Sequence, residues 1–163
     1  MVSRYYYHLT DEDWGKKKRL HPRAEGKNRD SHFEPDTARI CVSSTISGCF
    51  VAKYVQEMHG FRIYRTKRKV RSVPPVEVVD HKITNEYWLL KSTEFVLHAE
   101  LDFDSMSGIL DDFSKMFGDM TCALGDGEKK TEKWQKKMKT KITNLLRRKG
   151  IRPKKSRKKT TVL

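Results

Sequence analysis

Apolar residues recur at helical spacing in two stretches of the carboxyl-terminal half, and each stretch predicts an amphipathic helix. We expect the first helix over residues 105–120 and the second over residues 128–149. The apolar positions are Ile109, Leu110, Phe113, Met116, Phe117 and Met120 in the first stretch and Trp134, Met138, Ile142, Leu145 and Leu146 in the second. Gly150 and Pro153 mark the end of the second helix. The two apolar stripes predict an antiparallel helical hairpin that docks on the rest of the protein.

The first hundred residues show a different pattern, with short runs of aromatic and β-branched residues that are typical of strands. We expect strands at residues 4–9, 40–42, 61–65, 76–79, 87–90 and 95–103. Thr10 to Trp14 has the spacing of a short capped helix. Residues 16–35 are polar and interrupted by glycine and proline, which predicts a long surface loop. The fold class is therefore α+β, with a small mixed or antiparallel sheet.

The stretch from Arg39 to Phe50 predicts a strand, a turn and a helix in immediate succession. Ile40, Cys41 and Val42 form a short apolar run. Ser43, Ser44 and Thr45 then supply hydroxyls that can cap the first amides of a helix. Because backbone N–H groups converge at such a junction, this turn is a candidate site for a small anion.

These patterns divide the chain into three parts. An α+β domain is expected over residues 1–104, the helical hairpin over residues 105–149, and a basic tail over residues 150–163. The tail has no apolar periodicity and cannot bury a core of its own, so we expect it to be disordered when free.

Charge is distributed unevenly between these parts. The chain has 163 residues and a formal net charge of +14. Residues 128–163 contain 16 lysines and arginines and two glutamates, so they account for the whole excess. The preceding segment, residues 101–127, is acidic; its aspartates are Asp102, Asp104, Asp111, Asp112, Asp119 and Asp126. A positive charge of this size favours a polyanionic partner.

Several classes of protein are not indicated by the sequence. The three cysteines are an odd number without a CxxC pair, which argues against a disulfide framework and a zinc ribbon. No apolar run approaches the ~18 residues that a membrane span needs, and the amino terminus lacks a signal-peptide pattern. Phosphate-loop, dinucleotide-binding and zinc-protease motifs are missing from the sequence. We expect a cytoplasmic protein without a metal, a cofactor or a membrane partner.

The density of cations near the carboxyl end predicts contact with several phosphates of a nucleic acid. The candidate nucleic-acid-binding residues are Lys136, Lys137, Lys139, Lys141, Arg147, Arg148, Lys149, Arg152, Lys154, Lys155, Arg157, Lys158 and Lys159. No zinc-finger spacing, RNP1-like motif or GXXG loop provides base readout. We therefore expect largely sequence-independent binding to double-stranded DNA, more than to RNA. An import signal, a solubilising tail and contact with an anionic membrane surface are the other interpretations of such a run. The cations of residues 16–19, 23–29 and 65–71 either extend this basic surface into the folded domain or belong to solvated loops.

A second set of residues lies in the first ninety positions. His8 ends the first strand, Leu20 to Arg23 follows, Arg39 to Ser43 forms a strand with a terminal hydroxyl, and Glu86 precedes a later strand. This layout, over about residues 5–90, resembles the ADP-ribosyltransferase superfamily and the related RNA 2′-phosphotransferases, and also small phage and bacterial proteins. The likeness to phage and bacterial proteins implies a nucleoid-associated or transcription-modulating factor, in the host cytoplasm if the protein is phage-encoded.

The resemblance implies an alternative function and a catalytic site. His8 would hold a nicotinamide ribose or a phosphate, Arg39 and Ser43 would line a nucleotide cleft, and Glu86 would stabilise an oxocarbenium-like transition state. NAD would be the cofactor, and the target would be associated with nucleic acid. A third hypothesis is an interaction protein whose basic helix binds an acidic protein partner.

Overall fold

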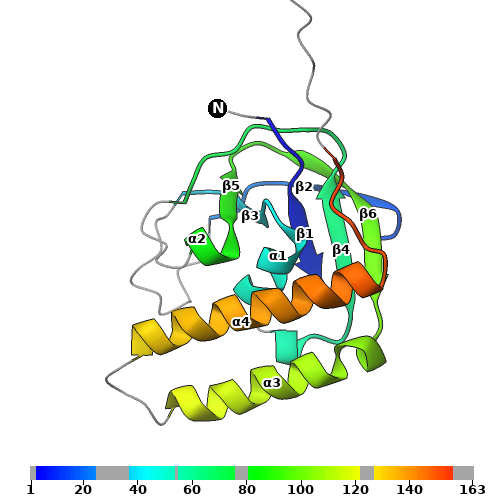
Figure 1. Cartoon of the computed structure of the whole chain (residues 1–163). Helices are drawn as coiled ribbons and strands as arrows, with labels where there is room; N and C mark the ends of the chain where they lie inside the picture. The colour runs from blue at the N-terminus through cyan, green and yellow to red at the C-terminus, as the bar shows by residue number, and fades with distance from the viewer. Residues whose placement is uncertain (1–2, 25–36, 54, 76–80, 122–126, 156–163) are drawn as a thin grey trace, which may run out of the picture.

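The computed structural model describes residues 3–24, 37–53, 55–75, 81–121 and 127–155, and its centre is a six-stranded sheet (Figure 1). The strands are β1 (Tyr7–Thr10), β2 (Lys17–Leu20), β3 (Ile40–Ser43), β4 (Phe61–Thr66), β5 (Glu86–Leu89) and β6 (Thr93–Leu101). Their order across the sheet is β2-β6-β4-β1-β3-β5, and every neighbouring pair is antiparallel. The α+β class is confirmed, with the antiparallel form of the sheet.

The sheet is curled, because its two edge strands contribute to the same core. Leu89 of β5 is buried in a cluster with Tyr6, Tyr64 and Phe95, and Leu20 of β2 packs against that cluster. Since β2 and β5 lie at opposite ends of the strand order, the sheet must bend around these side chains. We call this the inner cluster.

The helices lie on the other face of the sheet. They are α1 (Ile46–Ala52), the single 3₁₀ turn η1 (Val55–Glu57), α2 (His81–Thr84), α3 (Phe103–Thr121) and α4 (Gly127–Arg148). Figure 1 shows α3 and α4 running antiparallel across that face. Their apolar stripes form the second and larger core, the helix-side cluster, with Tyr7 and Leu9 of β1 and Ile63 of β4. The helical residues buried in it include Met106, Ile109, Phe113, Met138, Ile142, Leu145 and Leu146.

Two local predictions are wrong. Thr10 to Trp14 is not helical; the Thr10 hydroxyl accepts the Glu12 N–H, and the Asp13 carboxylate accepts the N–H of Gly15, whose φ is +64°. This Asx-type turn feeds β2, which lies inside the segment expected to be a loop. Charged residues give β2 no apolar signature, and it is held by its backbone pairing with β6 at the edge of the sheet. The expected strand at residues 76–79 lies outside the described residues.

The beginning of the tail is also ordered, which corrects the expectation of disorder for residues 150–155. Gly150 has a φ of +71° and ends α4: its N–H donates to Arg147 O, and the Ile151 N–H donates to Leu146 O. This pair of bonds is the Schellman motif, and Ile151 packs on the helix-side cluster. The chain then turns back along the sheet (Figure 1). Residues 156–163, including Arg157, Lys158 and Lys159, lie outside the described part.

Candidate nucleic-acid interface

The candidate catalytic residues of the sheet lie on two different faces. Ser43 is paired with Glu86 across β3 and β5 and with Tyr7 of β1, so these three side chains share the helix-covered face. His8 is the next residue of β1 and points to the opposite face. There it stacks on Trp14, with ring centroids 5.3 Å apart, and meets the edge of Phe95 at 6.2 Å. The backbone layer of the sheet therefore separates His8 from Ser43 and Glu86.

His8 has a structural role in this position. Burial lowers the pKa of His8 from 6.5 to about 4, so the imidazole is neutral at pH 7. Its Nδ1 lies 3.1 Å from Cys41 O, and the carbonyl must be the acceptor of that bond. The His8 side chain thereby links β1 to β3 and completes the aromatic packing of the inner cluster.

Arg39 and Glu86 both contact one buried tryptophan. The Arg39 guanidinium lies 4.6 Å from the centroid of the Trp88 ring, and Glu86 Oε1 accepts the indole N–H at 3.1 Å. Burial, with the Glu86 charge as a smaller cause, raises the pKa of the neighbouring Cys41 thiol to about 11. Burial also raises the pKa of Cys49 to about 12, so neither thiol is ionised at neutral pH.

The hydroxyls of the strand–turn–helix unit bind protein groups. Ser43 Oγ donates to Thr84 O at 2.7 Å and accepts the Thr45 N–H at 3.1 Å. Thr45 is the N-cap of α1; its hydroxyl accepts the Gly48 N–H and donates to Asn85 Oδ1. These hydrogen bonds within the protein occupy the hydroxyl groups that could have bound an anion. The helix α1, with only seven residues, is also a short one for an anion site at its N-terminus.

Ser43, Thr45, Thr84 and Asn85 form a connected set of hydrogen bonds that we call the polar hub, and one lysine of α4 belongs to it. Lys139 Nζ donates to Ile83 O at 2.8 Å and also to the Asn85 side chain. Burial lowers the pKa of Lys139. This side chain connects α4 to the junction of α2 and β5 and is not directed at solvent. It is a structural lysine, although its residue type and position placed it among the predicted nucleic-acid contacts.

Three further cations of the predicted set have acidic partners. Lys141 pairs with Asp112 of α3, Lys136 pairs with Glu132 one turn earlier at 2.6 Å, and Lys149 lies 3.9 Å from Asp102. Lys137, Arg147, Arg148, Arg152, Lys154 and Lys155 are exposed and have no ion pair within the described part of the chain.

The ordered start of the tail brings cations from distant segments together. His98 of β6 donates from Nε2 to Arg152 O at 2.8 Å, and the Lys154 N–H donates to the Tyr7 hydroxyl at 2.7 Å. The pKa of His98 is lowered, mainly by burial, and the positive charges of Arg65 and Lys154 contribute in the same direction. Tyr7 is paired with Arg65 of β4, so the tail lies next to the end of β4.

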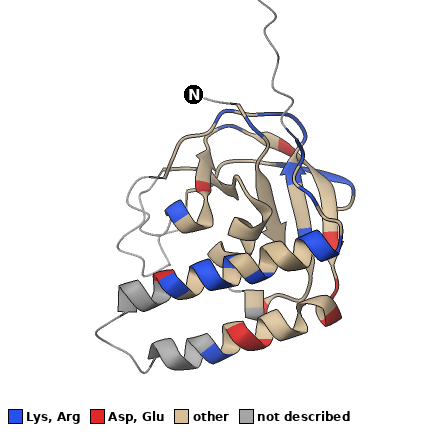
Figure 2. Ribbon diagram, in the orientation of Figure 1, with Lys and Arg blue, Asp and Glu red and all other residues tan. Residues whose placement is uncertain are grey.

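The loop after β4 extends this surface. Lys67 pairs with Glu94 at 2.6 Å, whereas Arg68, Lys69 and Arg71 are exposed and have no ion pair among the described residues. Figure 2 shows this loop and the tail as neighbouring basic segments at one end of the molecule. We define the basic band as the cations that start at the end of α4, cross the tail and reach this loop. They are Arg147, Arg152, Lys154, Lys155, Arg65, Arg68, Lys69 and Arg71, and all but the half-buried Arg65 are exposed.

The opposite side of the helical hairpin is acidic. Asp102, Asp104, Asp111 and Asp112 lie on or just before α3, which Figure 2 shows as a separate red region. A polyanion would be repelled from this edge and attracted to the basic band.

This surface joins predicted tail residues to cations of the folded domain. From the sequence, Arg65 and the run of four cations in residues 67–71 are an extension of the basic surface that was weighed against a solvated loop, and they are not among the candidate nucleic-acid-binding residues. Placing that run beside the tail required the contacts of Tyr7 and His98, which no local pattern reveals.

Comparisons with protein-family models, with curated proteins and with solved structures find no match for this chain. The resemblance to ADP-ribosyltransferases is therefore neither supported nor opposed by a relative. No helix in the described part of the chain is long and apolar enough to cross a membrane. The described residues also hold no group of histidine, cysteine and carboxylate side chains that could bind a metal ion.

Proposed function

We propose that this protein binds double-stranded nucleic acid, DNA in preference to RNA, through phosphate contacts of the basic band and without base readout. The observation that supports this proposal is the docking of residues 150–155 on β1 and β6. That docking brings Arg152 and Lys154 of the tail toward the β4 loop. Arg147, Arg152 and Lys154, with Arg68, Lys69 and Arg71 of that loop, have no carboxylate partner in the described structure, whereas Lys67 and Lys149 do.

The preference for a duplex follows from the positions of the aromatic rings. Single-stranded nucleic acids are bound by stacking of bases on exposed aromatic side chains. Among the described residues the exposed large hydrophobic side chains are Leu90, Leu97 and Phe103, and only Phe103 is aromatic. It packs edge-on against Phe61, with centroids 5.2 Å apart, beside the acidic end of α3. The basic band contains one half-buried ring, that of Tyr5 against the Arg65 guanidinium, and no platform of exposed rings among the described residues. This composition suits the regular phosphate rows of a duplex.

The binding energy comes from the release of counterions. Each phosphate that a cation neutralises contributes about 0.9 to the slope of log K against log salt concentration on duplex DNA. A surface of this kind positions the protein on the duplex without selecting a sequence. We accordingly propose a nucleoid-associated or transcription-modulating role, in which coverage of DNA matters more than the choice of site.

The test is a salt titration of a fluorescent 20-base-pair duplex, followed by anisotropy. The band variant carries Arg147→Gln, Arg152→Gln and Lys154→Gln. If its three cations each contact one phosphate, the slope falls by about 2.7 from the wild-type value. The matched control, Lys53→Gln with Lys82→Gln and Lys115→Gln, removes the same charge from exposed positions outside the basic band.

The outcomes are distinct. An unchanged slope in the control and a reduced slope in the band variant support the basic band. Equal losses in the two variants mean that the attraction comes from net charge alone, and the band is then the wrong site. No wild-type binding at about 0.1 M salt, a concentration at which surface charges still interact, overturns the function itself. Parallel titrations with duplex RNA and single-stranded DNA test the preference.

A further inference from the structure

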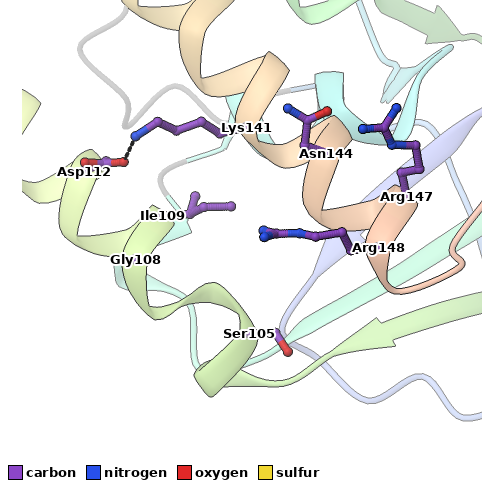
Figure 3. A pocket seen from close by; sticks show the side chains of 8 residues that line it. All are labelled: Ser105, Gly108, Ile109, Asp112, Lys141, Asn144, Arg147 and Arg148. Carbon is purple, nitrogen blue, oxygen red and sulfur yellow. Dashed lines mark hydrogen bonds and ion pairs between the residues drawn. The ribbon is translucent and has the colours of Figure 1, made fainter.

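A groove between α3 and α4 has the size of a small-molecule site. Its volume is about 660 Å³, and its lining includes Ser105, Gly108 and Ile109 of α3 and Lys141, Asn144 and Arg148 of α4 (Figure 3). Ligand sites in proteins commonly have volumes of about 300–1,000 Å³. The groove lies on the side of α4 that faces the acidic helix, away from the tail segment of the basic band.

The charges in the groove favour an anion. Its lining contains the cations Lys141, Arg147 and Arg148 and a single carboxylate, that of Asp112. Lys141 and Asp112 pair with each other, so the two arginines are in excess. Neither arginine has an ion pair or a side-chain hydrogen bond within the described part of the chain. The other described carboxylates of α3, Asp104 and Asp111, do not line the groove.

The two arginines have different directions although they are neighbours in the chain. Figure 3 shows the Arg148 side chain extending from α4 toward Ile109 and Ser105, whereas the Arg147 side chain points away from α3. Successive residues of a helix are 100° apart, which explains this divergence. Arg148 is thus the cation that faces the groove, and Arg147 lies at its rim and belongs to the basic band.

The walls of the groove leave room beside Arg148. At Gly108 a Cβ atom would have no heavy atom within 4 Å, so this position of α3 is open space. Ile109 is 8% exposed and forms an apolar floor, while Asn144 supplies a polar amide that makes no hydrogen bond among the described residues. An apolar floor with a few directed polar groups is the composition of a typical ligand site.

We propose that the α3–α4 groove binds a small ligand that carries a phosphate group, with Arg148 as its principal contact and Lys141 and Asn144 as additional donors. Guanidinium groups bind phosphate with two parallel N–H···O bonds, which makes arginine the fitting residue for such a group. The phosphate can belong to a free small molecule or to the 5′ end of a nucleic-acid strand. Phosphate binding in the groove does not require the basic band to bind a duplex.

The probe is inorganic pyrophosphate, titrated into the full-length protein by calorimetry at constant ionic strength. Arg148→Gln should weaken binding roughly tenfold to a hundredfold, because it removes charge-assisted hydrogen bonds. Arg147→Gln is the matched control, with the same change of residue and charge one position away, and should weaken binding less than about twofold if Arg147 only lines the rim. Circular dichroism verifies that both variants fold.

A variant without a charge change gives an independent test. Gly108→Leu places a side chain in the open space opposite Arg148 and should abolish pyrophosphate binding while the arginines remain. Equal weakening by Arg147→Gln and Arg148→Gln, or unchanged binding in Gly108→Leu, would overturn the groove as the site. Absence of wild-type binding at millimolar pyrophosphate would overturn it as well.

The source of the phosphate and the independence from duplex binding are tested with the same variants. Duplexes with and without 5′-phosphates are compared; a preference for the phosphorylated form that disappears in Arg148→Gln identifies a strand end as the source. Pyrophosphate binding without that preference identifies a free small molecule. If Arg148→Gln instead lowers the salt slope for duplexes as much as Arg147→Gln and leaves pyrophosphate binding intact, the groove proposal fails and the basic band includes Arg148.

Discussion

The polar residues of the sheet and the cations of the basic band differ in what they contact. Ser43 and His8 make their hydrogen bonds to the protein itself, and Arg39 packs on Trp88. In the basic band, Arg147 and Arg152 have exposed side chains without an acidic partner among the described residues. Polar groups of the first kind hold elements together, and those of the second kind remain available to another molecule.

This difference separates stability from binding in the same small protein. A substitution in the sheet should change the free energy of unfolding and leave the affinity for duplex DNA intact, whereas a substitution in the basic band should do the reverse. The four predictions below test that separation, from the largest expected effect to the smallest.

Gly48→Ala should give the largest loss of stability. A Cβ atom at this position of α1 would lie 2.0 Å from Thr84 O and 2.4 Å from Ser43 Oγ. The nearer atom belongs to the backbone, so α1 and α2 must separate, which we expect to cost about 3 kcal/mol or more. Urea unfolding measures the change. The control is Gly108→Ala, in open space on α3, which should stabilise the protein by roughly 0.5–1 kcal/mol. Equal effects at both glycines would contradict the close packing of α1.

The free energy of unfolding should also decrease as the pH is lowered, because of His8. The folded protein protonates this group near pH 4, while the unfolded chain protonates it near pH 6.5. Between these values the unfolded state binds more protons, so the contribution is complete above pH 6.5 and is lost as the pH falls toward 4. We expect a loss of about 2 kcal/mol between pH 7.5 and pH 5.

The check is urea unfolding at several pH values in this range, for the wild type and for His8→Gln. The glutamine can still donate a hydrogen bond to Cys41 O but does not titrate, so its stability should depend less on pH. Part of the dependence of the free energy of unfolding on pH should remain, because His98 also has a lowered pKa. A wild-type slope that persists unchanged in the variant would show that His8 is not buried as a neutral group.

The helical elements could be predicted from the sequence because their pattern is local. The 3.6-residue period of α3 and α4 records which side faces the core, and Met138, Ile142 and Leu145 are buried as that period requires. Lys139 was predicted as a nucleic-acid contact although it is adjacent in sequence to Met138. Its spacing of three residues from Ile142, which puts it only about 60° from that buried side chain, was the available signal that it turns toward the protein.

The other contacts depend on pairings that no local pattern contains. Tyr7 meets Lys154 across 147 positions of sequence. The side of the sheet on which His8 lies relative to Ser43 depends on the register of β1 against β3, and a shift of one residue would reverse it. The resemblance therefore supplied four residues in a plausible order, but the register directs them to two faces of the sheet.

Ser43→Ala tests whether the hydroxyl of the proposed nucleotide cleft is structural. The variant loses a hydrogen bond to Thr84 O and leaves the Thr45 N–H without its partner, at a position that is 3% exposed. We expect a loss of about 1–2 kcal/mol in urea unfolding. Duplex affinity at fixed salt should stay within about twofold, since the residue lies outside the basic band. A stable variant with altered duplex binding would place Ser43 in the interface instead of the polar hub.

The smallest effect separates two cations of the same helix. Lys139→Gln should lower the free energy of unfolding by about 1 kcal/mol, because its ammonium binds Ile83 O and the Asn85 side chain, while the salt slope of duplex binding stays at the wild-type value. Arg147→Gln removes the same charge from an exposed position and should leave unfolding unchanged within about 0.5 kcal/mol. Its salt slope should fall by about 0.9. If Lys139→Gln lowered the slope as much as Arg147→Gln, DNA would have to reach the junction of α2 and β5, and the division between structural and binding cations on α4 would be wrong.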